Sequence, residues 1–378
     1  MQLATPDEEL LRRLAETRLE RALVLSLYLN LDPSEFATPP ARATAVRSLL
    51  DSAERALRER EGLEHDDRVQ LQAGLEQARS LLTRELDADA SPALAVFACE
   101  PENLLEAVAL PRPVQNRVTI DRSPLIGPLT GMAHRERWCV VLVSRQDARV
   151  LRGSPDGLRE VEKVHDPVHG QHDQGGWSQA RYQRSVDKEV ADHLKHAAER
   201  LLRHFKRQPF ERLVVGGPRE VAAEFEGKLH GYLGDRLAGR IEVDVETSTP
   251  EQVLAASREC FEAHEEQRED QVLERLDEGA RGVAGLENVL RPLNERRVEA
   301  LLLDEAFSAS GTLCPRCGWL GPEGEERCPA DGAQLEACDD VAEKAIELAI
   351  QQSAEVLRLR RRREQLGERG GVGALLRF

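Results

Sequence analysis

The sequence lacks any run of about 20 apolar residues, the length that a helix needs to cross a lipid bilayer. The longest apolar-rich run, residues 22–31, follows an acidic, helix-like leader and has no cleavage signature, so we expect no signal peptide. Internal repeats and low-complexity segments are also missing. These absences exclude a membrane protein and favour a cytoplasmic location.

Positive charge is scarce as well. The chain has 52 Lys and Arg against 68 Asp and Glu, a formal net charge of −16. A protein that coats nucleic acid without specificity needs many phosphate contacts, so this balance argues against such a role. It leaves room for local basic patches that bind RNA.

The length of 378 residues predicts two or three domains, at about 150 residues per domain. A hydrophobic content of 40% is sufficient for packed cores. Composition and Pro-rich boundaries predict an N-terminal α/β domain over 1–130, a second domain over 131–268 and a third over 269–378. The acidic stretch 265–278, with seven acids and two bases, is typical of a solvated helical connector.

Hydrophobic periodicity predicts the main elements. In the first domain we expect a buried strand at 23–29, a pair of antiparallel helices hinged at Gly62, and strands at 93–98 and 104–110. The second domain is predicted to have strands at 138–143, 148–151, 158–164, 213–215 and 241–245, and a helix over 182–206. In the third, strands are expected at 298–303, 356–359 and 372–376, and a helix over 339–353. Strands that alternate with helices indicate an α/β fold class.

Four of the seven cysteines lie between 314 and 338. Cys314-Pro-Arg-Cys317-Gly is a knuckle whose two thiolates can face one ion, and Cys328-Pro-Ala-Asp331-Gly repeats its outline. Zinc takes four ligands in a tetrahedron, which predicts Cys314, Cys317, Cys328 and a fourth residue. The softness of thiolates favours Cys338, which we expect as the fourth ligand, whereas the repeated outline favours Asp331 as the alternative. We expect a closed structural zinc site; the alternative is a surface loop with reduced cysteines.

The most unusual polar stretch is Gly175-Gly176-Trp177-Ser178-Gln179. Two glycines allow positive φ and a close approach of the backbone to a ligand, and an amide side chain donates and accepts hydrogen bonds. The alternative is that these residues form an ordinary turn that binds no ligand.

A basic helix is expected to follow this stretch. Residues 181–207 carry eight bases against four acids, a local charge of +4. Arg181, Arg184 and Lys188 are therefore candidates for RNA binding. The alternative is an ordinary amphipathic surface helix.

Together, the order of the domains, the Gly-Gly-Trp-Ser-Gln-Ala-Arg loop, the Cys-x-x-Cys insert and the ending 370–378 resemble the bacterial archaeo-eukaryotic release-factor-like proteins. These are relatives of eukaryotic peptide chain release factors and of Vms/Ankzf-type peptidyl-tRNA hydrolases. The resemblance covers residues 131–378. It implies an RNase H-like middle domain and a C-terminal α/β/α domain similar to Pelota and K-turn-binding proteins, with a zinc-ribbon-like insert at 312–338.

The resemblance also implies a function. The loop matches the Gly-Gly-x-x-Gln form of the hydrolase branch at Gly175, Gly176 and Gln179, which would be the catalytic residues, with Trp177 stacking on RNA. The implied activity is hydrolysis of peptidyl-tRNA on the ribosome, during rescue or stress. The implied partners are the ribosome, tRNA and rRNA, and a translational GTPase. The alternative is a ribosome-binding hibernation factor that does not hydrolyse the ester.

Two further groups have open interpretations. His165, Asp166, His169, His172 and Asp173 stand ahead of the loop, where the hydrolases are more basic; they could hold a metal ion or belong to a polar loop. The arginine run, defined as Arg358 and residues 360–363, could bind rRNA. It is equally typical of a solvated edge strand, where cationic side chains deter strand pairing.

Overall fold

The computed structural model describes residues 3–17, 19, 22–85, 91–133, 136–167, 179–279 and 281–378, and the side chains of these residues except 84, 85 and 179–183. The chain forms two compact units. The first unit combines residues 1–134 with 269–378, and the second unit is the segment 135–268.

The first unit contains an antiparallel sheet of four strands in the order β3-β2-β1-β4. The strands are β1 (Val24–Asn30), β2 (Ala93–Cys99), β3 (Leu104–Leu110) and β4 (Arg117–Asp121). The central strand β1 is buried on both faces because alternate side chains enter two different cores. Leu25 and Leu27 pack in the core under α2 and α3, whereas Val24 and Tyr28 pack in the opposite core. The predicted buried strand is confirmed.

Three helices accompany this sheet: α1 (Glu8–Glu16), α2 (Pro39–Glu59) and α3 (His65–Glu85). Asp7 caps α1 by accepting the backbone N–H of Leu10 at 2.8 Å. Prolines fill the first positions of α2, where no intrahelical donor is lost. Gly62 joins α2 to α3 with φ of +76°, a conformation that favours glycine. The predicted helix pair with its hinge is confirmed.

The C-terminal part of the first unit has a sheet of order β10-β16-β11-β15 and a small sheet of order β13-β12-β14. The N-terminal part ends with helix α4 (Gly127–Ala133). The strands and helices of the C-terminal part are β10 (Gly282–Ala284), α9 (Leu286–Asn294), β11 (Val298–Asp304), β12 (Gly311–Leu313), β13 (Leu320–Pro322), β14 (Glu336–Cys338), α10 (Val341–Gln351), β15 (Glu355–Leu359), α11 (Arg363–Gly367) and β16 (Val372–Leu376). The strands and the helix predicted between 298 and 376 are confirmed. One core includes Leu14, Tyr28 and Phe97 together with Leu301 and Ile346, so the two chain segments share it.

A buried ionic network also joins these two segments. The Lys344 ammonium of α10 lies 2.8 Å from Asp121 and 3.0 Å from Glu347, and Ser123 donates to Glu347 at 2.8 Å. Burial raises the pKa of Glu347. Burial alone would lower the pKa of Lys344, but the carboxylates of Glu347 and Asp121 raise it overall. The attraction between these opposite charges therefore offsets the free-energy cost of burying them.

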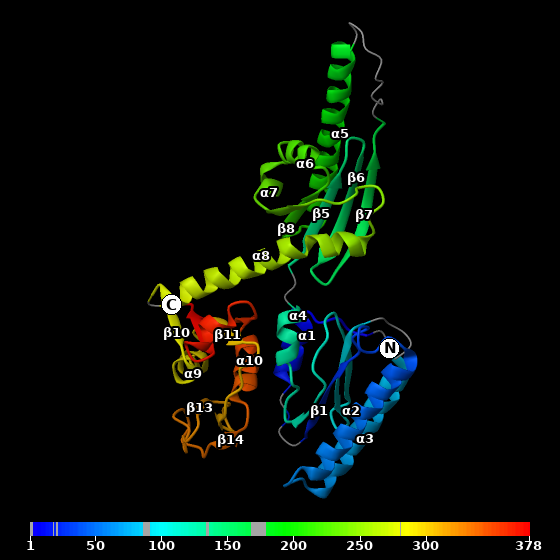
Figure 1. Ribbon diagram of the computed structural model, residues 1–378. Helices are drawn as coiled ribbons and strands as arrows, with labels where there is room; N and C mark the ends of the chain where they lie inside the picture. The colour runs from blue at the N-terminus through cyan, green and yellow to red at the C-terminus, as the bar shows by residue number, and fades with distance from the viewer. Residues whose placement is uncertain are drawn as a thin grey trace. The chain divides into compact units, whose positions relative to one another are not determined.

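The second unit is built on a five-stranded sheet of order β7-β6-β5-β8-β9 (Figure 1). The strands are β5 (Trp138–Val143), β6 (Asp147–Ser154), β7 (Gly157–His165), β8 (Arg212–Gly216) and β9 (Leu237–Ile241). Only β6 runs antiparallel to the other strands. This mixed α/β sheet agrees with the RNase H-like fold class that the sequence resemblance implied.

Helices cover both faces of this sheet. Cys139 and Val141 of β5 pack in a core with α5 (Gln179–Arg207), α6 (Arg219–Glu226) and α7 (Gly231–Gly234). Trp138 and Val140 face the first part of α8 (Pro250–Asp277). The rings of Trp138 and Phe261 pack edge to face there, with their centroids 4.4 Å apart. Among the helices of the described residues, none is long and apolar enough to cross a membrane.

One predicted strand was wrong. We expected a strand at 241–245, and the structure forms β9 over Leu237–Ile241 instead. The reason is the side chain of Asp244, which accepts the backbone N–H groups of Glu246 and Thr247 at 3.0 and 2.7 Å and makes a turn there.

The buried network gives a stability prediction. Lys344→Ala leaves the carboxylate of Glu347 buried without its cation, so we expect the free energy of unfolding to fall by about 3–5 kcal/mol. Denaturant unfolding would measure it. The double substitution Lys344→Met with Glu347→Leu removes both charges and should cost much less. Lys228→Ala, in an exposed pair with Glu224, is the control and should change stability by less than about 1 kcal/mol. If Lys344→Ala had the same free energy of unfolding as the wild type, this prediction would be contradicted.

Candidate functional site

The Gly-Gly-x-x-Gln motif lies at the start of helix α5. Gly175, Gly176, Trp177 and Ser178 are outside the described residues. Gln179 is the first residue of α5, a helix of 29 residues. A helix of this length spans about 43 Å, and Figure 1 shows that its N-terminal part extends beyond the strands of the sheet.

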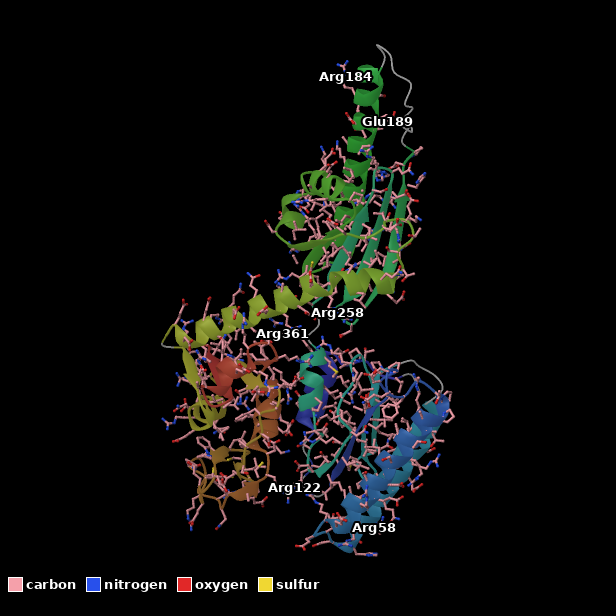
Figure 2. All side chains as sticks on the ribbon, viewed as in Figure 1. Arg58, Arg122, Arg184, Glu189, Arg258 and Arg361 are labelled. Atoms are coloured by element: carbon pink, nitrogen blue, oxygen red, sulfur yellow. The ribbon has the colours of Figure 1, made fainter. Side chains whose placement is uncertain are left out.

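An apolar stripe holds the rest of α5 on the sheet. Its members recur at helical spacing and are all buried; they are Val186, Val190, Leu194, Ala197, Ala198 and Leu201. The opposite face carries the bases expected from the sequence. Arg184 and Lys188 are exposed, and Figure 2 shows Arg184 on the part of α5 that extends beyond the sheet. Arg181 also lies on α5, and its side chain is outside the described set.

Positive charge is concentrated at the other end of α5 as well. Burial lowers the pKa of His204, and the nearby guanidinium groups of Arg152, Arg207, Arg200 and Arg203 lower it further. The carboxylate of Glu162 is paired with His204 and with Arg200 and offsets part of this positive charge. Local positive charge on α5 thus coexists with the net charge of −16.

The residues just ahead of the motif are tied to neighbouring elements. Nδ1 of His165 lies 2.9 Å from Oδ1 of Asp147. Asp166 has two imidazole partners on α5: Nδ1 of His193 at 2.7 Å and Nδ1 of His196 at 3.0 Å, both to Oδ2. Burial would raise the pKa of Asp166, but the hydrogen bonds from the two imidazoles lower it overall.

We name Asp166, His193 and His196 the Asp166 cluster. Sequence inspection missed its two histidines because they lie 27 and 30 residues after Asp166. The signal was present: His193 and His196 are three residues apart, which places them on one side of a helix. Of the residues ahead of the motif that could hold a metal ion, His165 and Asp166 have these protein partners. His169, His172 and Asp173 lie outside the described residues.

The cysteine cluster forms a compact donor set. Cys314, Cys317, Cys328 and Asp331 place their ligand atoms within 4.8 Å of one another, and they are the one such group in the described part of the chain. The sulfurs of Cys317 and Cys328 are 3.4 Å apart, and Cys314 Sγ is 3.7 Å from Asp331 Oδ1. A tetrahedral zinc ion about 2.3 Å from each sulfur requires sulfur separations of about 3.8 Å, so the set fits the ion.

The pKa values of two thiols in the cluster move in opposite directions. Burial would raise the pKa of Cys314, but backbone N–H groups of Cys317 and Arg316 lower it overall. The pKa of Cys317 is raised to about 12 by desolvation, with contributions from the neighbouring sulfurs of Cys314 and Cys328. Several thiolates at this spacing repel one another unless a cation neutralises them. The spacing of the four donor atoms suits a single bound cation.

Asp331, the alternative that the repeated knuckle outline favoured, is the fourth member of this donor group, in place of the expected Cys338. Its carboxylate accepts the backbone N–H of Ala333 at 3.0 Å, and this bond lowers the pKa of Asp331. Cys338, the other candidate, is not part of the group. It lies at the end of β14, where it pairs with Gly311 of β12.

The arginine run is bound to acids of the same unit. Arg362 forms a bidentate ion pair with Asp270, at 2.5 and 2.8 Å, and Arg360 lies 2.9 Å from Glu305. The carboxylate of Glu269 is 7% exposed and accepts the backbone N–H groups of residues 360, 361 and 362 at 2.7–3.0 Å. The expectation that residues 265–278 form a solvated connector was therefore wrong for the part that carries Glu269 and Asp270. Internal pairing reduces the charge that the run can offer to RNA.

Comparison with known proteins gives a family match in the second unit. Residues 124–262 match a family described as bacterial archaeo-eukaryotic release factor family 10. Peptide chain release factor subunit 1 of Archaeoglobus fulgidus is 27% identical over 306 residues, which cover 73% of this chain and 74% of the relative. Its counterpart from Methanobrevibacter smithii is 26% identical over 277 residues, or 65% and 66% of the two chains.

Solved structures with some likeness include an archaeal translation termination factor, aRF1, at 17% identity and a TM-score of 0.27, covering 99% of each chain. Pelota from Archaeoglobus fulgidus is 15% identical, with a TM-score of 0.35 over 76% of this chain and 79% of that one.

The donor set predicts the metal content of the purified protein. We expect about one zinc per chain by elemental analysis, lost in Cys314→Ser and Cys328→Ser because either change removes a thiolate ligand. Asp331→Ala should weaken zinc retention against a chelator, whereas Cys338→Ser should retain zinc like the wild type. Cys260→Ser, outside the cluster, is the control.

The Asp331 and Cys338 variants separate the two candidate ligands. Zinc lost from Cys338→Ser and kept in Asp331→Ala would assign the fourth position to the thiolate. A wild-type protein prepared with ample zinc that contains none would exclude the site.

Proposed function

We propose that this chain is a member of the bacterial archaeo-eukaryotic release-factor-like proteins, whose family 10 it matches over residues 124–262, and that it hydrolyses peptidyl-tRNA on the ribosome. The observation that carries the proposal is the place of Gln179. It begins a helix that is basic and extends beyond its sheet, and it stands three residues after Gly176 of the motif.

The chemistry needs a donor for an oxyanion. Water attacks the ester carbonyl that links the peptide to tRNA, and negative charge develops on the carbonyl oxygen in a tetrahedral intermediate. The first N–H groups of a helix have no intrahelical acceptor, and the helix dipole favours negative charge at this end. Gln179 and the next residues of α5 therefore offer backbone donors to the intermediate, and the Gln179 amide can order the attacking water.

The glycines have a different role. Gly175 and Gly176 lack a β-carbon, so the backbone can adopt positive φ and approach a crowded RNA-lined cavity. Trp177 has a flat aromatic surface that can stack on a base of the tRNA end. The cysteine cluster with Asp331 would hold a structural zinc between the strands of the small sheet β13-β12-β14, and this scheme routes no step of hydrolysis through it.

The partners follow from the same scheme. The ribosome and the peptidyl-tRNA supply the substrate, and Arg181, Arg184 and Lys188 contact RNA phosphates along α5. Among the solved structures with some likeness, one is a model of ribosome-bound archaeal Pelota with ABCE1, at 14% identity and a TM-score of 0.39 over 100% of this chain and 95% of that one. A translational GTPase is a further proposed partner, which would deliver the protein to stalled ribosomes.

The decisive variant is Gln179→Ala. Peptide release from stalled ribosomes should fall by about 10²–10³-fold, because one positioned donor to the oxyanion is lost. Single-turnover release from radiolabelled peptidyl-tRNA measures this, and ribosome pelleting measures binding, which should stay unchanged. Gln183→Ala, one turn further along α5, is the matched control.

Two results would overturn hydrolysis: equal release by Gln179→Ala and the wild type, or no release by the wild type on any ribosomal substrate. If binding persisted in either case, the ribosome-binding hibernation factor would replace the hydrolase.

The RNA-facing helix predicts the salt dependence of ribosome binding. Affinity should fall as salt rises despite the net charge of −16, since contacts with phosphates release counterions. Changing Arg181, Arg184 and Lys188 together to Glu should weaken binding and reduce the slope of log affinity against log salt by about 3.

A matched reversal of three exposed arginines on α2 is the control and should leave the slope unchanged; these are Arg47, Arg55 and Arg58. Binding that is insensitive to salt, or equal slopes for the two reversals, would contradict a role for α5 in RNA contact.

A further inference from the structure

The Asp166 cluster joins the two ends of the chain segment that contains the motif. Asp166 follows the last residue of β7, and its partners His193 and His196 lie on α5, whose first residue is Gln179. Residues 179–192 of α5 thus precede the first contact with Asp166, and at about 1.5 Å per residue they span about 21 Å. Any tilt of the helix at the cluster is amplified at Gln179.

The side chain of His193 is committed to this contact. It is fully buried, at 0% exposure, and an ionised carboxylate only accepts hydrogen bonds, so Nδ1 carries the proton that is donated to Asp166. Nε2 is buried and has no hydrogen-bond partner in the described part of the chain. A buried imidazole with one unsatisfied nitrogen is costly, and the bond to Asp166 offsets that cost.

Asp166 is fixed from its backbone as well. Its N–H donates to the carbonyl of Gln146 at 2.9 Å, in the turn between β5 and β6. The preceding residue, His165, is bound to Asp147 at the same turn. The carboxylate is therefore anchored to the sheet, and the two histidines connect that anchor to α5.

We propose that Asp166 is a positioning residue, which through His193 and His196 fixes the direction of α5 and so the location of Gln179. The residue touches neither substrate nor the reacting atoms. The apolar stripe holds α5 against the sheet, but apolar contacts are not directional, whereas two charge-assisted hydrogen bonds to one carboxylate define an orientation. This inference rests on the proposed function for its effect on catalysis and on the fold alone for its effect on the helix.

The first experiment does not depend on catalysis. In the free protein, Asp166→Ala should speed hydrogen–deuterium exchange of the amides of residues 184–192 by about tenfold or more, since charged hydrogen bonds are lost at the anchor. Exchange in α6 should not change. Asp166→Asn keeps an acceptor oxygen without the charge and should restore part of the protection. Asp192→Ala, an exposed acid on α5, is the matched control.

The second experiment measures release at saturating protein. Asp166→Ala should lower the maximal release rate by about tenfold and leave the half-saturating concentration unchanged, because the RNA-binding side chains are intact while Gln179 is misplaced. Asp166→Asn should recover part of the rate. A general loss of folding would lower binding too, and the concentration dependence separates the two causes.

The outcomes are distinct. Faster exchange in residues 184–192 with a lower maximal rate supports the positioning role. Unchanged exchange overturns it, whatever the catalytic result, and so does an unchanged rate when exchange is faster. If the wild type releases no peptide, the proposed function fails, and the exchange measurement alone then decides whether Asp166 orients α5.

Discussion

The candidate site depends on the burial of one apolar stripe on helix α5. The stripe runs from Val186 to Leu201 and packs on the face of the sheet that carries Cys139 and Val141. Among the described side chains of α5, the stripe begins at Val186, and the N-terminal part of the helix extends beyond the sheet. Gln179 is the first residue of this extended part, where the proposed function requires it to meet its substrate.

Apolar and polar contacts have different roles in this arrangement. Apolar burial provides the stabilisation, since it scales with the area removed from water and has little direction. Direction comes from Asp166 and its two histidines, which connect the end of β7 with the middle of α5. The proposed hydrolysis would need both, because a catalytic group on a long helix is displaced by small rotations at the anchor.

In the first unit, apolar and polar contacts likewise both join the two chain segments. One apolar core contains residues from both, and Lys344 pairs across the segment boundary with Asp121. Glu269 and Asp270 then hold the arginine run, so that α8 is bonded to the C-terminal sheet through its acids. Charges that resemble an RNA-binding patch in the sequence serve here to fix a helix.

The sequence by itself predicted most of the elements and a resemblance to release-factor-like proteins. Alternation of apolar residues specified β1 and β5, the spacing of Cys314, Cys317 and Cys328 specified a metal-binding knuckle, and the Gly-Gly-x-x-Gln motif indicated the family. These signals are local, since each depends on residues within a few positions of one another. Only the tertiary structure decided which distant groups meet. It brought Asp331 to the three thiols, His193 and His196 to Asp166, and Glu269 to the arginine run, because these contacts follow from packing that no local pattern encodes.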